Sequence, residues 1–380
     1  MAFAIVGAEI AQGQDFIKGH AVLVGGSRVE AICPADRLPP DIERRHVSGM
    51  LAPGFIDAQV NGGGGVLFND APNVDAIRAI GAAHRRFGTT GFLPTFMSDT
   101  REKMADAVEA VRDGLTLGIP GLLGIHLEGP FLNPERKGVH DARFMRPIEE
   151  EDICIMTSLG AGRTLVTLAP DMVPAEAISR LVEAGVIVSA GHTAADLATM
   201  AEARGRGLTG YTHLFNAMPP MAGRAPGPVG AALGDPRAWC GLIVDLHHVS
   251  VPALKVAIAA HGVERMMLVT DAMPPTGTDL PDFELHGRTI FRRGGRLTTE
   301  DGTLAGSDLD MASAVRNCVA ELSLSTPTAL MMASLAPASF LRLDDELGRI
   351  APGYRASFAL LNEGLIARRT WIDGVEQEGA

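Results

Sequence analysis

Three residues of this sequence could together bind a divalent metal ion. Glu128 lies in GIHLEGP, His192 in SAGHT and His213 in GYTHLF, and each residue follows a separate apolar stretch. One carboxylate and two imidazoles are ligands that zinc and other divalent transition metals accept. Three protein ligands leave one coordination position for water, whose pKa falls towards about 7 on such a metal. The residue types therefore indicate a catalytic metal site rather than a structural one.

Asp271 could act as an acid and base beside that metal. It ends the apolar stretch RMMLVTDAM, where a single aspartate is otherwise commonly a helix cap or turn residue. Next to an activated water, a carboxylate can accept a proton and then deliver it to a leaving amine. We therefore expect Asp271 to be the catalytic acid/base.

Eight apolar segments with the character of β-strands have to position these residues. They are residues 54–60, 91–96, 121–130, 164–170, 186–193, 210–218, 240–249 and 265–273. Stretches with a helical pattern lie between them, at 74–87, 101–117, 175–184, 194–204 and 251–261, the last with Ser250 as its N-cap. The alternation predicts an α/β protein.

The polar residues at the strand ends favour one α/β architecture over another. A closed (β/α)8 barrel has its chemistry where the strands end, so functional side chains should follow several different strands. An open, doubly wound sheet instead collects its ligands at one switch point between strands. Because polar residues follow nearly every segment, the sequence predicts a (β/α)8, TIM-like barrel.

Short β-like segments with frequent Gly and Pro occur before and after the barrel pattern. We expect them to form one small β-sandwich domain from both ends of the chain. The predicted division is 1–51 plus 345–380 for the small β domain and 52–344 for the barrel of a metal-dependent hydrolase.

Composition excludes several classes of protein. The formal charge of −12 disfavours binding to nucleic acid and to anionic membranes. No apolar run approaches the roughly 20 residues of a membrane span, and the N-terminus lacks the basic start of a signal peptide, so we expect a cytoplasmic protein. The four cysteines form no C-x-x-C pair and are expected to be buried free thiols: Cys33, Cys154, Cys240 and Cys318.

The motifs in combination are more specific than any of them alone. LAPGFIDAQVNG, GIHLEGPFLNPERKGVH, SAGHT, THLFNAMPPMAGRAPG, DLHHV, LVTDAM and TLAGSDLDM occur in this order over essentially the whole chain. In this the sequence resembles the N-acetylglucosamine-6-phosphate deacetylases of the amidohydrolase superfamily. The resemblance implies a metal-dependent hydrolysis of N-acetylglucosamine 6-phosphate to glucosamine 6-phosphate and acetate, with Asp271 as the acid/base.

The resemblance also implies which residues hold the substrate. One of His140 and His248 would polarise the acetyl carbonyl, and the residues alone leave open which of the two does so. Arg224 would reach the phosphate in the neighbouring subunit, which implies a homodimer with shared sites. The full set of implied substrate residues is His140, Asn216, Ala217, Arg224, His248, Leu304, Ala305 and Gly306.

The segment DAQVNGGGG after the first strand bears on the number of metal ions. Other amidohydrolases place H-x-H at this strand end to bind a second metal, and here the two positions are Gln59 and Asn61. Amides are weak metal ligands but good hydrogen-bond partners for water and carboxylates. We therefore expect one metal per subunit, zinc first and iron, cobalt or manganese as alternatives, with both amides ordering the water. Residues 62–65 should leave room for substrate.

Two histidines and one insertion have no assigned chemistry. His126 could either orient Glu128 or be a core residue, and His247 is expected to be structural. Residues 277–302 look like a hairpin insertion. The alternative functions are another amide hydrolase of the superfamily, dihydroorotase-like or aminoacylase-like, and an inactive barrel that binds sugar phosphate.

Overall fold

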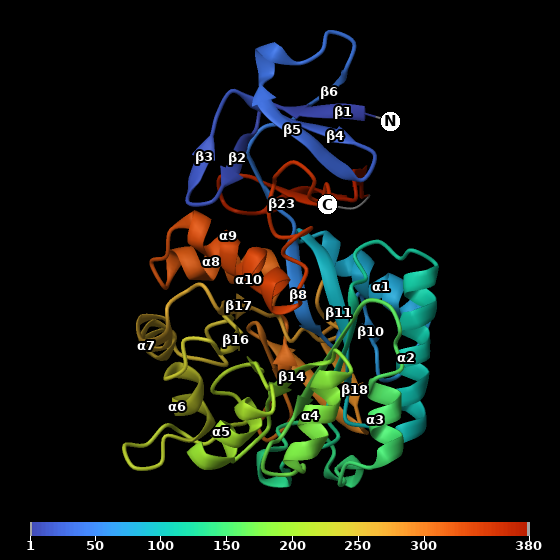
Figure 1. Ribbon diagram of the computed structural model, residues 1–380, viewed down its shortest axis with the longest axis vertical. Helices are drawn as coiled ribbons and strands as arrows, with labels where there is room; N and C mark the ends of the chain where they lie inside the picture. Colours follow the sequence, from blue (N-terminus) through green and yellow to red (C-terminus); the bar gives the residue numbers. More distant parts are fainter. Residues whose placement is uncertain (1, 378–380) are drawn as a thin grey trace.

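Eight parallel strands form the centre of the molecule. The computed structural model describes residues 2–377 (Figure 1). In sheet order the strands follow the chain, each paired with the next: β8 (Phe55–Val60), β11 (Thr89–Met97), β12 (Gly124–Glu128), β13 (Arg163–Leu168), β14 (Ile187–Ala190), β15 (Gly210–Tyr211), β16 (Trp239–Leu242) and β17 (Met266–Leu268).

The sheet closes between its first and last strands. Val60 pairs in parallel with Ala272, and the Asp271 N–H donates to the Gln59 carbonyl at 3.0 Å. Closure removes the two free edges and makes the sheet a barrel. The predicted (β/α)8 architecture is confirmed.

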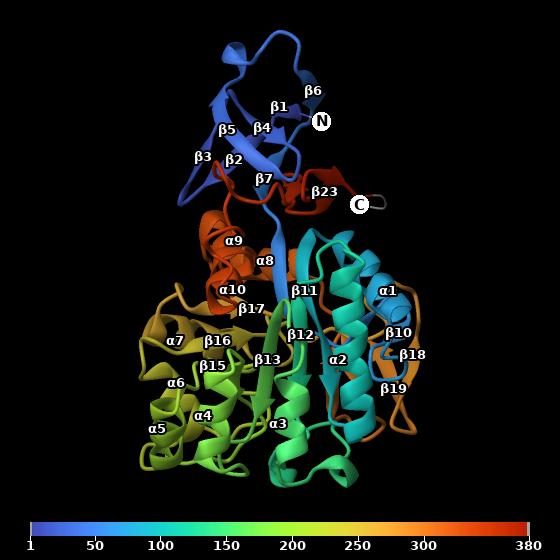
Figure 2. The same cartoon turned by 45° about the vertical axis from the view of Figure 1, so that its right-hand side comes forward.

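Helices surround the barrel (Figures 1 and 2). They are α1 (Val74–Arg85), α2 (Arg101–Thr116), α3 (Glu150–Met156), α4 (Ala175–Glu183), α5 (Leu197–Gly205), α6 (Gly227–Leu233), α7 (Val251–His261), α8 (Met311–Ala320), α9 (Thr326–Ala333) and α10 (Leu335–Phe340). Short 3-10 turns are η1 (Ala35–Arg37), η2 (Pro134–Arg136) and η3 (Ala142–Phe144).

Side-chain caps set where several helices begin. Asn73 accepts a hydrogen bond from the Ala76 N–H at the start of α1. The predicted start of α5 at residue 194 was wrong, because Asp196 caps the helix by accepting from the Thr199 N–H. Ser250 is at the N-cap position of α7 as predicted, but its side chain makes no capping hydrogen bond.

Both ends of the chain build a second unit above the barrel (Figure 1). One sheet contains β1 (Ala2–Val6), β4 (His20–Gly25), β5 (Arg28–Pro34) and β6 (Glu43–His46). The other contains β2 (Glu9–Gln12), β3 (Asp15–Ile17), β7 (Met50–Pro53), β22 (Phe358–Leu361), β23 (Ala367–Ile372) and β24 (Val375–Glu376). One apolar cluster joins the two, including Phe3 and Val22 from the first sheet and Leu51, Phe358 and Trp371 from the second. The predicted sandwich from both chain ends is confirmed, while its residue boundaries stay a prediction.

The insertion after the eighth strand is larger than the predicted hairpin. It is a four-stranded antiparallel sheet of β18 (Asp282–Leu285), β19 (Arg288–Arg293), β20 (Arg296–Thr298) and β21 (Leu304–Ser307). Its buried face, with Leu285, Ile290 and Leu297, packs against Val139 and Met273. The sheet therefore supports loops next to the barrel mouth.

The cysteines differ in part from the expectation. All four are free thiols, and Cys240 and Cys318 are buried, but Cys154 is exposed and Cys33 is half-buried. Cys154 lies on α3, whose buried face is made by other residues, and this explains its exposure. None of the helices in residues 2–377 is long and apolar enough to cross a membrane.

Candidate active site

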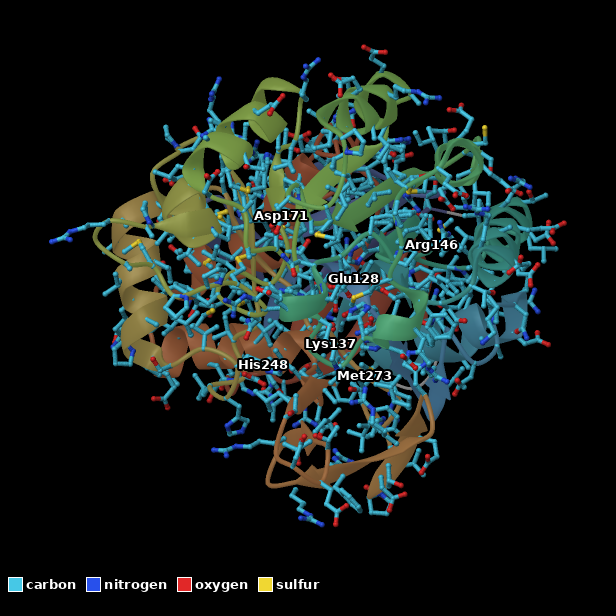
Figure 3. The ribbon with its side chains drawn as sticks, turned by 90° about the horizontal axis from the view of Figure 1, so that it is seen from below. Glu128, Lys137, Arg146, Asp171, His248 and Met273 are labelled. Atoms are coloured by element: carbon cyan, nitrogen blue, oxygen red, sulfur yellow. The ribbon has the colours of Figure 1, made fainter. Side chains whose placement is uncertain are left out.

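Three strand ends bring the predicted metal ligands together at the end of the barrel remote from the small domain. Figure 3 looks into that end and shows Glu128 near the centre. The Glu128 Oε1 lies 3.0 Å from the His213 Nε2 and 3.3 Å from the His192 Nε2, and the two Nε2 atoms are 3.1 Å apart. All three side chains are buried.

This geometry fits a divalent metal ion. Ligand atoms about 2.1 Å from a tetrahedral zinc lie about 3.4 Å from one another, close to the observed separations. The His192 Nδ1 must donate to the Arg136 carbonyl, at 2.8 Å, so the lone pair of a neutral His192 is on Nε2 and faces Glu128. Burial opposes ionisation of Glu128, but contacts with His192 and His213 in their protonated forms outweigh it and hold its pKa well below the usual range. An ionised carboxylate is the form that binds metal.

A second combination of residues is possible on distance alone. Glu128, His140 and His192 each offer an atom within 4.8 Å of the others. The His140 Nε2, however, is 4.0 Å from the nearest Glu128 oxygen, farther than either other histidine. The tighter set is the predicted one with His213.

The backbone turns these side chains into the mouth. His192, His213 and Asp271 have positive φ angles of 50°, 32° and 53°, a region that non-glycine residues seldom adopt. Such conformations cost about 1–3 kcal/mol each and cluster at functional sites. The same turns end the strands early, so the predicted strand 210–218 was too long and β15 stops at Tyr211.

Asp271 lies beside the cluster and is joined to it by an amide. The Gln59 Nε2 is 3.1 Å from the Asp271 Oδ1 and 3.3 Å from both Glu128 oxygens. The Asn61 Nδ2 donates to the same Asp271 oxygen at 2.7 Å. Burial, together with the charge of Glu128, raises the pKa of Asp271 to about 6. The two amides are therefore hydrogen-bonded to the carboxylates. This was expected from the sequence, where Gln59 and Asn61 stand at the positions at which other amidohydrolases have H-x-H.

His248 is fixed by a neighbouring carboxylate. The Asp245 Oδ2 lies 2.6 Å from the His248 Nδ1, and the Asp245 Oδ1 accepts from the backbone N–H groups of His247 and His248 at 2.9 Å each. The His247 ring instead accepts from the Arg296 Nε at 3.2 Å. Of the two adjacent histidines, His248 faces the mouth and His247 contacts the insertion.

A cavity of about 190 Å³ occupies the mouth. Beyond the metal cluster and Asp271, the predicted residues that line it are His140, Asn216, Ala217, His248, Leu304 and Gly306. Two predicted residues do not: Ala305 packs into the core of the insertion, and Arg224 lies on an exposed loop. Sequence reasoning missed Met97, Gly138, Val139, Met273 and Thr303. Gly138 and Val139 directly precede His140 and Thr303 precedes Leu304, so chain proximity could have indicated these three.

The four glycines after the first strand do not line that cavity. They contribute β9 (Gly62–Gly63), which pairs with β10 (Val66–Leu67). A Cβ atom on Gly63 would overlap the ring of His84 on α1, whose Nε2 is 2.9 Å from the Gly62 carbonyl oxygen. The expectation that these glycines leave room for substrate was wrong, because α1 fills the space beside Gly63 and Gly64, and Val66 and Pro274 fill that beside Gly62.

His126 is held by two threonines. Its Nδ1 is 3.1 Å from the Thr95 hydroxyl and its Nε2 is 2.7 Å from the Thr167 hydroxyl, so both ring nitrogens are engaged away from Glu128. Burial lowers the pKa of His126 to about 4. The structure favours the core alternative for this residue.

One buried carboxylate was not singled out from the sequence. Asp57 accepts from the Thr270 hydroxyl at 2.5 Å, and its other oxygen accepts from the backbone N–H groups of Gln59 and Thr270 at 3.2 Å each. Burial raises the pKa of Asp57 to about 7. Asp57 therefore ties the first strand to the residue just before Asp271.

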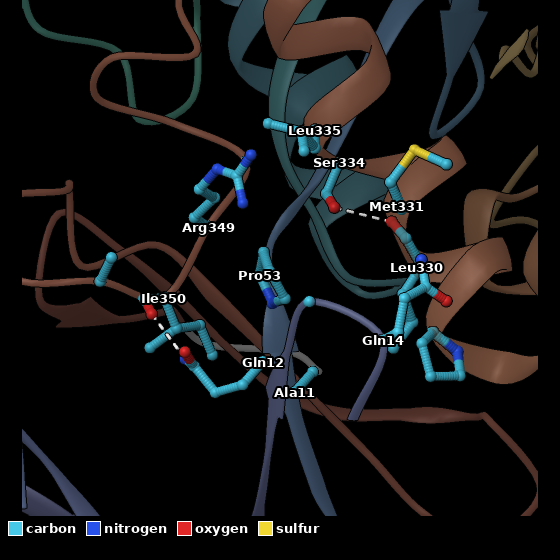
Figure 4. Close-up of a pocket in the computed structure, with 14 residues that line it drawn as sticks. Ala11, Gln12, Gln14, Pro53, Leu330, Met331, Ser334, Leu335, Arg349 and Ile350 are labelled. Atoms are coloured by element: carbon cyan, nitrogen blue, oxygen red, sulfur yellow. Dashed lines mark hydrogen bonds between the residues drawn. The ribbon is translucent and has the colours of Figure 1, made fainter. Parts of the chain in front are cut away.

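A larger cavity lies elsewhere, at the opposite end of the barrel, between the small domain and α9 and α10 (Figure 4). Its volume is about 290 Å³, and it includes Pro53, Leu330, Ser334 and Arg349. Its lining contains no histidine and no carboxylate among the described residues. The N-terminal end of such a barrel is associated with stability rather than chemistry, so the smaller cavity is the candidate active site.

Comparison with known proteins identifies the family of this chain. Residues 50–376 match the Amidohydrolase family, and residues 2–51 match the NagA composite domain. An N-acetylgalactosamine-6-phosphate deacetylase from Shewanella sp. (strain ANA-3) is 42% identical over 87% of this chain and 84% of its own length. An N-acetylglucosamine-6-phosphate deacetylase from Haemophilus influenzae is 32% identical over the full length of both chains.

Solved structures extend the similarity to the whole fold. The crystal structure of N-acetylglucosamine-6-phosphate deacetylase from Pasteurella multocida has a TM-score of 0.95 and 34% identity, covering 99% of this chain and 100% of that one. The corresponding protein from Mycobacterium smegmatis has a TM-score of 0.90 and 30% identity, covering 98% and 99%. The chain belongs to the amidohydrolase family, and the four relatives described above are deacetylases of N-acetylated amino-sugar 6-phosphates.

Proposed function

We propose that this chain hydrolyses the acetamide of N-acetylglucosamine 6-phosphate to glucosamine 6-phosphate and acetate. The supporting observation is the pair of carboxylates, Glu128 and Asp271, bridged by the Gln59 amide beside two histidines at the barrel mouth. The names of the full-length relatives supply the substrate. Because another relative is an N-acetylgalactosamine-6-phosphate deacetylase, the 4-epimer is the second substrate to assay.

We propose that Glu128, His192 and His213 hold one divalent metal ion per subunit, and that this metal is zinc. When bound, such an ion polarises a carbonyl oxygen and makes water a nucleophile near neutral pH. Gln59 and Asn61 keep the neighbouring carboxylates in place and offer no strong second metal site, since amides are weak ligands.

Asp271 moves the proton in this reaction. Its carboxylate takes a proton from the attacking water as the oxygen bonds to the acetyl carbon, and it then gives that proton to the nitrogen as the C–N bond breaks. A pKa raised to about 6 suits both steps near neutral pH, because the group is a base before the attack and a usable acid after it. The released amine and acetate account for all atoms of substrate and water.

The acetyl carbonyl needs a hydrogen-bond donor as its oxygen becomes negative. His140 suits this position, because its ring packs against that of His192 at a centroid distance of 4.6 Å and its Nε2 is near Glu128. His248 lines the other part of the cavity and is left for the sugar phosphate. This assigns the two histidines whose roles the sequence left open.

We also propose a homodimer in which Arg224 binds the phosphate in the neighbouring subunit. Arg224 lies in a tight turn, where Ala222 and Ala225 pair across it, on an exposed loop that follows the cavity residues Asn216 and Ala217 in the chain. A permanently charged, planar guanidinium is suited to phosphate, and a chain of charge −12 needs such a group near its anionic substrate. A cytoplasmic location accords with that substrate.

The test is acetate release from N-acetylglucosamine 6-phosphate by wild type and Asp271→Asn. We expect the variant to lose at least about a thousandfold in kcat while binding metal as before. Asp113→Asn, an exposed change on α2, is the control that should behave as wild type. Equal rates in wild type and Asp271→Asn would refute the mechanism. Metal binding without hydrolysis by wild type would favour the inactive barrel, and hydrolysis of a different amide would favour another amidohydrolase.

A further inference from the structure

His140 is held from behind by one residue, Ser98, which directly follows β11. The Ser98 Oγ lies 2.8 Å from the His140 Nδ1, and the backbone N–H of Ser98 donates to the same nitrogen at 3.3 Å. Both residues are buried. Two groups of Ser98 therefore converge on one nitrogen of the ring, on the side away from the cavity.

These contacts decide which nitrogen of His140 carries the proton. A backbone N–H can only donate, so the Nδ1 that faces it must have a free lone pair. The imidazole is then neutral with its proton on Nε2, and the Ser98 hydroxyl also donates to Nδ1. An Nε2–H has no lone pair for a metal and can only donate to a ligand in the cavity.

The second histidine of the cavity is held in the opposite way. The carboxylate of Asp245 can only accept, so the His248 Nδ1 carries the proton. A neutral His248 thus presents a lone pair on Nε2, whereas a neutral His140 presents an N–H. Of the two, His140 is the neutral donor.

We propose that Ser98 is a positioning residue that fixes His140 as a neutral Nε2–H donor to the acetyl carbonyl oxygen and prevents it from serving as a metal ligand. The kinetic part of this inference rests on the proposed deacetylase function. The proton position does not, because it is a property of the protein without substrate.

Neighbouring residues preserve this contact. A Cβ atom on Gly129, at φ +86°, would overlap the Ser98 Oγ, so only a glycine leaves room for the hydroxyl. The His140 N–H donates to the Lys137 carbonyl at 3.0 Å, and Arg288 of the insertion donates to the Val139 carbonyl at 2.6 Å. The backbone of His140 is thereby held independently of Ser98, so a change at Ser98 should affect mainly the ring.

The direct experiment is two-bond ¹H–¹⁵N NMR of zinc-loaded, substrate-free protein labelled with ¹⁵N-histidine. The His140 signals are those missing from His140→Gln. We expect the Nδ1 in the range of a nitrogen with a free lone pair and the Nε2 in the range of a protonated nitrogen. A protonated Nδ1, or an Nε2 shifted like those of metal-bound histidines, would overturn the proposal.

Variants of Ser98 then connect the proton position to the reaction. In Ser98→Ala we expect the form protonated at Nδ1 to appear and kcat to fall about 3- to 10-fold, the usual effect of one hydrogen bond, with KM within about twofold. Ser98→Thr keeps the hydroxyl, so this variant should have the wild-type proton position on His140 and the wild-type kcat. If Ser98→Ala keeps the wild-type proton position, the proposal is overturned whatever the rate.

The two hypotheses can fail separately. A wild type that releases no acetate contradicts the proposed function, yet the NMR spectrum still decides the role of Ser98. A full deacetylase whose His140 is protonated at Nδ1 leaves the proposed function intact and removes Ser98 from its positioning role.

Discussion

Gln59 is the residue on which the arrangement of the two carboxylates depends. Its amide is within hydrogen-bonding distance of Glu128 and Asp271 at once, so it keeps the two carboxylates close without neutralising either. A histidine at this position would offer a lone pair to a second metal, which an amide does not do well. The glutamine at this position therefore supports the proposal of one metal ion per subunit.

Replacing Gln59 by leucine should slow the reaction without loss of the bound metal ion. Hydrogen bonds to charged groups contribute about 1.5–3 kcal/mol, so we expect kcat to fall about 10- to 100-fold. Metal content should remain near one per subunit, measured by metal analysis of purified protein. Gln14→Leu, on the surface of the small domain, is the matched control; loss of metal in Gln59→Leu but not in the control would contradict this interpretation.

The pH dependence of hydrolysis should report Asp271. Burial and the charge of Glu128 raise its pKa to about 6, and below its pKa the carboxyl is protonated and cannot accept a proton. A bound cation favours the ionised form and moves the pKa down. We therefore expect kcat/KM to fall with decreasing pH below a value no higher than about 6. An acidic limb centred above pH 7 would assign the base to another group.

At the scale of elements, the functional residues that follow the strands could be predicted from the sequence. Hydrogen bonds between side chains on different elements could not. Glu128, His192, His213 and Asp271 each follow an apolar run, and a closed barrel forces such residues to meet. Asp57 and Ser98 carry no such signal, because their partners are distant in sequence and the hydrogen bonds depend on side-chain direction. The sequence predicts a hairpin-like insertion at residues 277–302, whereas its packing next to the mouth depends on side-chain contacts that the sequence pattern does not show.

Asp57, which ties β8 to the residue before Asp271, should make folding stability depend on pH. Its pKa is about 7 when folded against an ordinary value of 3.8, so between these values the folded chain binds more protons than the unfolded chain. The free energy of unfolding from this group therefore falls as pH rises from about 4 to 7, by on the order of 4 kcal/mol. The asparagine in Asp57→Asn cannot ionise, so the free energy of unfolding of this variant should not show that decrease.

Denaturant unfolding of the metal-free proteins at pH 4.5 and 7.5 checks this expectation. Relative to wild type, the free energy of unfolding of Asp57→Asn should be higher at pH 7.5 than at pH 4.5. A difference that is the same at both pH values would show that Asp57 has no raised pKa.

The insertion sheet should affect substrate binding through the loop 304–306. Ile290→Ala leaves a cavity in the core under that loop, which costs about 2–4 kcal/mol and should raise KM several-fold with less effect on kcat. Ile5→Ala removes the same atoms from the core of the small domain, far from the mouth. It should lower Tm but leave KM unchanged, and equal KM values in the two variants would contradict a supporting role for the insertion.

At the scale of the whole molecule, the position of Arg224 is the reason for the proposed homodimer. Arg224 is exposed and does not line the cavity of its own chain. In the proposed symmetric dimer, the Arg224 loop of each subunit would lie at the barrel mouth of the other, so each subunit would complete its partner's site. The fold of one chain could be predicted from its sequence, but this arrangement depends on a second copy.

Mixing two inactive variants tests this arrangement. In a heterodimer of Arg224→Ala and Asp271→Asn, one site has both an intact Asp271 and an intact Arg224 from the partner. Random exchange should therefore restore about a quarter of wild-type activity. Each variant alone is the control. No restoration despite verified heterodimers would show that Arg224 acts within its own subunit or not at all.

In the proposed deacetylase mechanism, Glu128, His192 and His213 hold one metal ion per subunit. The most direct measurement adds zinc stepwise to the metal-free protein while acetate release from N-acetylglucosamine 6-phosphate is recorded. We predict that the rate rises linearly and reaches its plateau at one zinc per subunit. A plateau at two zinc ions per subunit, or a full rate in the metal-free protein, would contradict a mechanism with one metal ion per subunit.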